Sequence, residues 1–336
     1  MCTSTTRCAA WLSLESVGLP HSGCLHSPGW LQRCIVPSSQ SIMNPSVYVS
    51  TPHETLRCIK TVFHGTFGYI DWATYDNAEG RKGVYCKRPI LAGRSLLLEA
   101  CIQQLVGETL ASIGFQTGAP RVLRVFRLRE ESVCFAMEPI EGAITLDSYL
   151  ATLPVSCLPN VLVDCLLQLC AMIWHLNNHV GINHRDLKPS NFLVVEHEPR
   201  SKLLLIENEM MEIVSRCTLT LIDFGFSCLG SLSTRIANVS LSTVYPPSDP
   251  CPKDGRDLFL LLGILYIDYY GVLPAQLLAL FESWLQEPGS TFCRFLRLDK
   301  ESSKRWLYFM IGNDTVTRFP SLPLRMVQDL QAFLAT

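Results

Sequence analysis

The octapeptide His-Arg-Asp-Leu-Lys-Pro-Ser-Asn at residues 184–191 constrains the fold of this chain more than any other stretch. It places an acid, a cation and an amide close together, directly after a strongly apolar segment. Asp186 is suited to accept a hydroxyl proton, and Lys188 to face a phosphoryl oxygen. Asn191 and the downstream carboxylate Asp223 carry oxygen atoms suited to hold Mg²⁺. In-line phosphoryl transfer needs these parts, because it depends on positioning and charge neutralisation.

The octapeptide and the later Asp-Phe-Gly at 223–225 resemble the catalytic loop H-R-D-L-K-P-x-N and the D-F-G of eukaryotic-type protein kinases. The resemblance implies an α+β, bilobal fold, with a small β-rich N-lobe carrying one helix and a larger, mostly helical C-lobe. It implies ATP and Mg²⁺ as cofactors, with Asp186 as the base and Asn191 and Asp223 as metal ligands. Lys188 resembles the serine/threonine subgroup. Divergence elsewhere suggests the compact kinases of large DNA viruses or lower eukaryotes.

A Gly-Thr-Phe-Gly sequence lies between two strand-like runs. Glycines at such a turn let backbone N–H groups point at phosphate oxygens, although the same pattern also makes ordinary hairpin turns. The loop departs from G-x-G-x-x-G, because Phe63 stands where the first glycine would be. Under the kinase resemblance, the nucleotide contacts here are Gly65, Thr66, Phe67, Gly68 and, on the following run, Ile70.

A strand-like run ending at Lys87 resembles the V-A-I-K run of kinases, in which the lysine bridges the α- and β-phosphates. Its expected partner is Glu99, on a helix predicted over residues 95–107. Glu99 begins the pattern E-x-x-I-x-x-L, whereas the competing candidate, Glu108, lacks apolar residues at the corresponding positions. Tyr85 replaces the small residue that normally lines the adenine pocket, a departure from the kinase pattern.

Residues 133–140 form an apolar run leading into a connector, and they resemble the kinase hinge. Met137 then stands at the gatekeeper position, and backbone groups of Glu138 and Ile140 are expected to meet the adenine edge. Leu193 is expected to form the floor of the adenine site. Backbone atoms make the hinge contacts, so side-chain identity there constrains little.

These features divide the chain into an extension at residues 1–55, an N-lobe at 56–138 and a C-lobe at 139–336. The extension has few charged side chains and no helical or strand period, so it is predicted to be disordered. It could be a simple leader or have a regulatory role. Residues 196–216 lengthen the usual gap between catalytic loop and D-F-G, and we expect an added hairpin or helix there, with partner binding as the minority interpretation.

The run from Asp223 to Asp249 has the length of a kinase activation segment, but A-P-E is absent. Asp249 stands where the glutamate of that motif would be, and we expect it to pair with an arginine in the last third of the chain. Serines and threonines in the run, including Ser240, are candidates for phosphorylation, with Arg185 as a docking cation. Asp257 is expected to cap a buried helix. The kinase resemblance implies that it also ties down the catalytic-loop backbone.

Composition narrows the partners and the compartment. A net charge of −2 gives no reason to expect nucleic acid or an anionic membrane as partner. The longest apolar run, residues 258–267, is shorter than the roughly 20 residues that cross a bilayer, so no membrane span is expected. The fifteen cysteines are dispersed without a Cys-x-x-Cys pair, which predicts reduced thiols in the cytoplasm or nucleus. A less regular alternative is a zinc site of His21, Cys24, His26 and Cys34. Oligomeric state is left open.

Two other functions fit the same motifs. A pseudokinase scaffold is favoured by Phe63, Tyr85 and the missing A-P-E, but every charged catalytic position is filled. A small-molecule phosphotransferase of the aminoglycoside or choline type shares H-x-D-x-x-x-x-N. Lys188 and the long segment before Asp249 speak against it. A serine/threonine protein kinase acting on protein hydroxyls is therefore the leading hypothesis.

Overall fold

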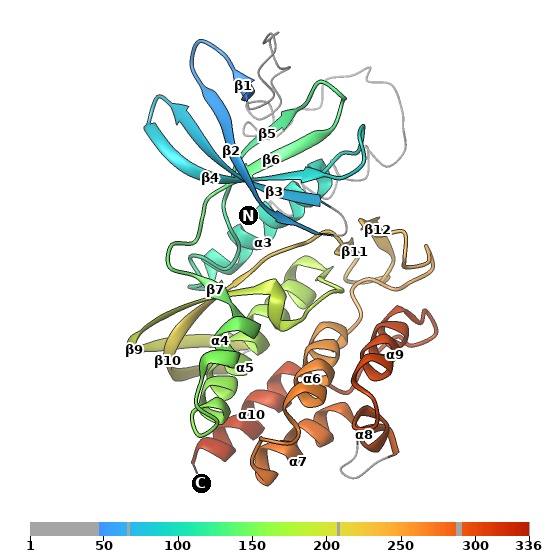
Figure 1. The fold of residues 1–336 in the computed structure, drawn as a ribbon. Helices are drawn as coiled ribbons and strands as arrows, with labels where there is room; N and C mark the ends of the chain where they lie inside the picture. The colour runs from blue at the N-terminus through green and yellow to red at the C-terminus, as the bar shows by residue number, and fades with distance from the viewer. Residues whose placement is uncertain (1–46, 66–67, 207–208, 287–290, 336) are drawn as a thin grey trace. The chain divides into compact units, whose positions relative to one another are not determined.

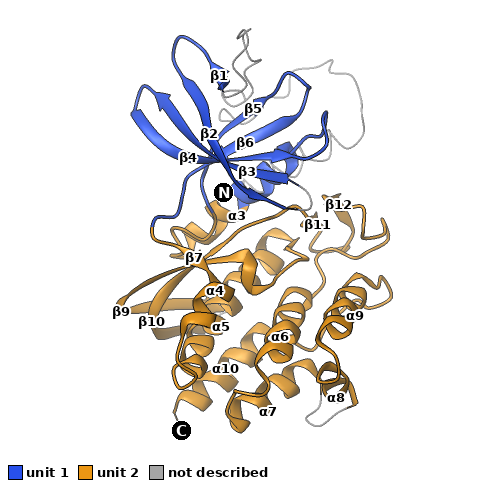
Figure 2. Ribbon diagram, in the orientation of Figure 1, with its two compact units in different colours: residues 1–105, 120–141 blue, residues 106–119, 142–336 orange. Residues whose placement is uncertain are grey.

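The computed structural model describes residues 47–65, 68–206, 209–286 and 291–335 (Figure 1). The chain divides into two compact units (Figure 2). The first comprises residues 1–105 and 120–141, and the second comprises residues 106–119 and 142–336. Apart from residues 106–119, the first unit ends at residue 141, three residues beyond the lobe boundary expected at residue 138.

The first unit contains a six-stranded antiparallel sheet and most of one helix. Its strands lie in the order β1-β2-β3-β4-β6-β5. On β3, alternate residues Asp71, Ala73 and Tyr75 are buried, as expected for a strand with one face on a core. The elements are β1 (Val47–Ser50), β2 (Thr55–His64), β3 (Gly68–Asn77), β4 (Gly80–Pro89), α3 (Leu97–Ser112), β5 (Val122–Arg127) and β6 (Val133–Met137).

The predicted disorder of residues 1–55 is wrong at its C-terminal end, where Val47–Ser50 form β1 against β2. The reason is long-range: the Tyr48 hydroxyl donates to Asp71 at 2.5 Å, and the Tyr48 ring stacks on Phe126. Nothing in the local sequence signals partners so far away. Residues 1–46 of the extension, with the candidate zinc ligands, lie outside the described residues.

The second unit is mostly helical, with two small sheets. Their strand orders are β10-β9-β7 and β12-β11-β8. The helices are α4 (Leu146–Thr152), α5 (Leu158–His175), α6 (Arg256–Tyr269), α7 (Ala275–Leu285), α8 (Thr291–Leu296), α9 (Lys300–Gly312) and α10 (Pro323–Leu334). The strands are β7 (Ile144–Thr145), β8 (Ile182–Asn183), β9 (Phe192–Ile206), β10 (Glu209–Leu221), β11 (Cys228–Gly230) and β12 (Ala237–Ser240).

Helix α5 is apolar nearly all round because it lies in the core of this unit. Together with the π-helical turn that follows, it forms the one stretch of the described residues, Leu158–Val180, that is long and apolar enough to span a membrane. Of that stretch's most apolar window, 72% is buried inside the protein, as in a core helix. Gln168 of α5 donates to Ser215 Oγ (2.8 Å) and to the Cys217 carbonyl (3.0 Å), which fixes β10 against the helix.

The insertion at 196–216 is a hairpin rather than a helix. It extends the β9–β10 ladder from the Phe192–Leu221 pair out to the Ile206–Glu209 pair, with one irregularity near Ser215 (Figure 1). Alternate residues of β10 are buried, Met211 and Ile213 among them, whereas Met210 and Val214 lie on its exposed face. The predicted α+β class, with a β-rich smaller unit and a mostly helical larger one, is confirmed.

Candidate active site

The catalytic-loop octapeptide begins after β8 and ends at a 3₁₀ turn, Pro189–Asn191, before β9. Asp257, in the first turn of α6, accepts hydrogen bonds from the backbone N–H groups of His184 (3.0 Å) and Arg185 (2.8 Å). The predicted role of Asp257 in tying down this loop is thereby confirmed. Its predicted role as helix cap is wrong, because the N-cap of α6 is Gly255 and the Asp257 carboxylate accepts from the loop instead. Arg185 has a φ of 67°, a left-handed conformation that needs such support in a residue with a side chain.

Asp186 lies at the centre of this loop's side-chain contacts. Its Oδ2 accepts hydrogen bonds from Lys188 Nζ (2.8 Å) and Asn191 Nδ2 (2.9 Å). Its Oδ1 accepts one from the Tyr308 hydroxyl at 2.7 Å. The structure therefore brings together three of the predicted site residues and adds a fourth residue from α9.

Tyr308 was missed by sequence reasoning, because it lies 122 positions from Asp186. The only sequence signal was its place beside the stripe of Ser303, Leu307 and Ile311, which face the core at helical spacing. Such a stripe indicates that a helix packs, but not which residue it faces. Burial and the Asp186 charge raise the pKa of Tyr308 well above its usual value, so its hydroxyl stays protonated and acts as the donor.

Asn191 and Asp223 lie close together because of strand register. Phe192, the first residue of β9, pairs with Leu221, the last residue of β10. Asn191, just before Phe192, and the residues just after Leu221 are therefore neighbours. The Ile222 N–H also donates to the Asn191 carbonyl at 3.1 Å. Asp223 has a φ of 63°, which turns the chain sharply after the strand.

This donor set fits Mg²⁺. The Asn191 amide nitrogen donates to Asp186, so its amide oxygen is the atom left to ligate, alongside the Asp223 carboxylate. No group of three His, Cys, Asp or Glu side chains able to hold a metal occurs in the described part of the chain. A magnesium ion held by Asn191 and Asp223 would take its remaining ligands from phosphate and water, as Mg²⁺ commonly does.

In the first unit, Lys87 of β4 and Glu99 in the first turn of α3 form an ion pair, with Nζ 2.5 Å from Oε1. The structure thus pairs Lys87 with Glu99 rather than with Glu108. Ile70 lies directly opposite Lys87 on β3. Gly65 and Gly68 close a turn through the Gly65 N–H and the Gly68 carbonyl (2.9 Å), while Thr66 and Phe67 lie outside the described residues.

The residues predicted to form the hinge also belong to the first unit. Met137 ends β6 and lies opposite Tyr85. Glu138 pairs with Arg121 (Nε to Oε2, 2.9 Å), and Ile140 follows shortly after. By contrast, Leu193 lies on β9 in the second unit, together with Asp186, Lys188, Asn191 and Asp223. That the two groups bind one nucleotide remains a prediction.

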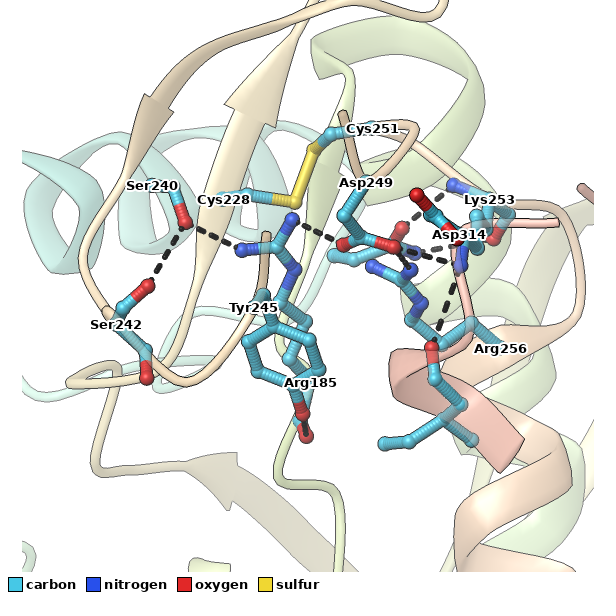
Figure 3. Close-up of polar contacts among 12 residues, drawn as sticks. Arg185, Cys228, Ser240, Ser242, Tyr245, Asp249, Cys251, Lys253, Arg256 and Asp314 are labelled. Carbon is cyan, nitrogen blue, oxygen red and sulfur yellow. Dashed lines mark hydrogen bonds and ion pairs between the residues drawn. A yellow bond between two sulfur atoms is a disulfide. The ribbon is translucent and has the colours of Figure 1, made fainter. Parts of the chain in front are cut away.

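A buried charge cluster, defined as Arg185, Asp249, Lys253 and Arg256, adjoins the catalytic loop (Figure 3). Asp249 binds Arg185 at 2.5 Å through one oxygen, and binds Lys253 (2.6 Å) and Arg256 through the other. All four side chains are fully buried, and the Tyr245 ring lies 4.5 Å from the Arg185 guanidinium. Asp249 therefore has the expected arginine partner in the last third, Arg256, and two further cations.

Three buried cations around one bound carboxylate leave positive charge only partly balanced. Burial, together with the neighbouring Arg256, lowers the pKa of Lys253 to about 8 and that of Arg185 to about 10. Arg185 Nε and Arg256 Nε and Nη1 are buried and make no hydrogen bond to the described residues. Because Arg185 also donates to Ser240 Oγ (2.7 Å), the cluster reaches β12 of the candidate activation segment.

The low pKa of Lys253 predicts a pH dependence of stability. Between the folded pKa of about 8 and the unfolded value of 10.5, the unfolded chain binds more protons, so stability rises with pH. We expect this lysine to add about 1 kcal/mol between pH 8 and 9. Urea unfolding at both pH values measures it, and Lys253→Met should abolish the increment. Equal increments in wild type and variant would show that Lys253 does not cause it.

The expectation that all cysteines are reduced is wrong for one pair: Cys228 of β11 and Cys251 form a disulfide (Figure 3). The two strands of chain meet closely there. A Cβ on Gly230 would lie 1.9 Å from the Cys251 carbonyl oxygen, so only glycine permits the approach. The disulfide thereby joins the start of the segment after Asp-Phe-Gly to its end, near the charge cluster.

Comparison with known proteins gives structural matches only. No protein-family model matches the chain, and no curated protein matches its sequence. Similar solved structures include the BubR1 kinase domain (TM-score 0.45, 15% identity, covering 98% of this chain and 92% of that one). Another is vaccinia related kinase 3 (TM-score 0.47, 12% identity, covering 97% and 95%). The β-rich unit, the mostly helical unit and the catalytic-loop contacts define a divergent protein-kinase-like fold.

Proposed function

We propose that this chain is a serine/threonine protein kinase, which transfers the γ-phosphate of ATP to hydroxyl groups of a protein substrate. The observation that carries the proposal is Asp186, held by Lys188 and Asn191, with Asp223 beside Asn191 across a strand register. A proton acceptor, a cation and two magnesium-type oxygen donors are thus grouped within the second unit. An intracellular location is part of the proposal, supported by the free thiols of the described cysteines other than Cys228 and Cys251.

In this mechanism Asp186 accepts the proton of the substrate hydroxyl as its oxygen bonds to phosphorus and the bond to ADP breaks. The Lys188 ammonium faces the oxygens of the transferred phosphoryl group and balances their negative charge while that group passes from ADP to the substrate. Asn191 and Asp223 would hold magnesium, which supplies charge neutralisation on the phosphates. Lys87, oriented by Glu99, is proposed to hold the α- and β-phosphates.

A pseudokinase scaffold is the second candidate, and one observation favours it. Tyr85 and Lys87 are two positions apart on β4, so their side chains lie on the same face of the sheet. The Tyr85 and Trp72 rings meet edge-on, with their centroids 5.1 Å apart. Two bulky rings therefore occupy the sheet face that carries the phosphate-binding lysine. If they exclude adenine, the chain binds partners without catalysis.

Thermal shift with magnesium–ATP, followed by transfer of labelled phosphate to dephosphorylated casein, separates these functions. We expect ATP to raise the melting temperature only with magnesium, and Asp223→Ala to lose this effect because one metal ligand is gone. Asp147→Ala, an exposed aspartate of the same unit, is the matched control and should behave as wild type.

The outcomes are distinct. Binding of magnesium–ATP without transfer to any protein would favour the pseudokinase scaffold. Labelling of a sugar or of choline, with no labelled protein, would point to a small-molecule phosphotransferase. Absence of any nucleotide-dependent shift would contradict the kinase proposal at its first step.

A further inference from the structure

The hydrogen bond between Tyr308 and Asp186 occupies the atom that the proposed reaction needs. Asp186 Oδ2 already accepts two hydrogen bonds, from Lys188 and Asn191, which uses the capacity of that oxygen. Oδ1 is therefore the proton acceptor for a substrate, and it accepts the Tyr308 hydroxyl at 2.7 Å. A tyrosine hydroxyl donating to this oxygen has the same chemistry as an incoming serine hydroxyl.

Burial leaves little room for a second donor. Asp186 is only 5% exposed, although a general base for a protein substrate has to be reached from solvent. Oδ1 has a second lone pair, but a nearly buried carboxylate offers almost no open surface from which to use it. A protein hydroxyl therefore reaches Asp186 only by displacing Tyr308.

Helix α9, which carries Tyr308, is held in place by two contacts. Leu307 packs directly on Gly263 of α6, where a Cβ would lie 2.6 Å from a Leu307 methyl carbon. At the end of α9, Lys253 donates to the carbonyl of Asn313 at 2.7 Å. The helix is therefore fastened both to the core of the second unit and to the buried charge cluster next to the catalytic loop.

We propose that Tyr308 is a plug in the acceptor site: its hydroxyl takes the place of the substrate hydroxyl on Asp186, so α9 competes with the protein substrate. The proposal rests on the proposed kinase function. Removing the hydroxyl should free Oδ1 to accept the substrate hydroxyl. When Tyr308 is displaced, the proton of the substrate passes to Oδ1, the substrate oxygen bonds to phosphorus, and ADP leaves.

The test is Tyr308→Phe, which keeps the ring and its packing. The first readout is binding of fluorescent, dephosphorylated casein in the presence of a non-hydrolysable ATP analogue, and it requires no catalysis. A hydrogen bond to a charged group is strong enough that its loss should tighten binding about tenfold. The second readout is phosphate transfer, where KM for casein should fall by a similar factor without a fall in kcat.

Tyr270→Phe is the matched control, because it removes a tyrosine hydroxyl just beyond the end of α6 remote from Asp257. It should change neither binding nor KM. ATP affinity should be the same in all three proteins, since Tyr308 touches none of the residues assigned to the phosphates. A urea midpoint close to wild type shows that Tyr308→Phe folds.

The plug and the kinase function fail in different ways. If Tyr308→Phe tightens casein binding but no protein transfers phosphate, the plug stands and the kinase function falls. If phosphate is transferred but binding and KM do not change, or kcat falls, Tyr308 is a positioning donor and the plug is wrong. Labelled phosphate on Tyr308 itself would make it an acceptor and would also overturn the plug. Absence of both binding and transfer would overturn both proposals.

Discussion

Asp186→Asn is expected to lower kcat for phosphate transfer by about a thousandfold, while leaving the binding of magnesium–ATP nearly unchanged. The substitution keeps the size of the side chain and one oxygen that can accept a hydrogen bond. It removes the carboxylate that takes the proton of the substrate hydroxyl. Lys87, which is proposed to hold the α- and β-phosphates, lies on β4 and is not altered.

Two measurements check this prediction: steady-state transfer to casein, and the thermal shift with magnesium–ATP. Asp147→Asn, on the exposed first turn of α4, makes the same chemical change in the same unit and should retain full activity. Near-wild-type turnover in Asp186→Asn would show that the role given to Asp186 is wrong. Loss of ATP binding would show that this carboxylate supports the nucleotide instead.

Sequence alone predicted the parts of the site whose residues are neighbours in the chain or follow a local period. The octapeptide gave Asp186, Lys188 and Asn191 together, because a short loop keeps them close whatever surrounds it. Glu99 followed from apolar residues at its third and sixth successors, which place it on the inner face of a helix. The contact of Asp257 with the loop was implied by the kinase resemblance.

The remaining contacts depend on packing between elements far apart in the chain, and no local pattern encodes them. Asp249 was expected to pair with one arginine in the last third of the chain. It also binds Lys253 and Arg185, through different carboxylate oxygens. The strand at Val47–Ser50 exists because Asp71, many residues later, supplies a buried acceptor for Tyr48. Tyr308 reaches Asp186 only because α9 packs on α6.

The same reasoning applies to the hairpin of β9 and β10. Its apolar residues were visible in the sequence, but short apolar runs fit both a strand and a helix. What decides between them is the ladder that starts at Phe192 and Leu221, next to the two predicted magnesium ligands. The hairpin thus continues the β9–β10 pairing that places Asn191 near Asp223. Gln168 of α5 holds β10 by donating to the Cys217 carbonyl.

Asp249→Asn is expected to destabilise the protein by about 3–5 kcal/mol, because it leaves three fully buried cations without their shared carboxylate. The amide matches the carboxylate in shape but carries no charge, so the loss reports electrostatics rather than a cavity. Urea unfolding measures the change, and a variant that fails to fold at 25 °C satisfies the same expectation. The exposed Asp147→Asn should stay within about 0.5 kcal/mol of wild type.

A double variant tests whether charge balance is the cause. Adding Lys253→Met to Asp249→Asn removes one of the stranded cations, so the pair should be less destabilised than the sum of the two single changes. Ser240→Ala, which removes only a part-exposed acceptor of Arg185, should cost far less than Asp249→Asn. Simple additivity of the two cluster variants, or an Asp249→Asn protein as stable as wild type, would contradict a cluster held together by Asp249.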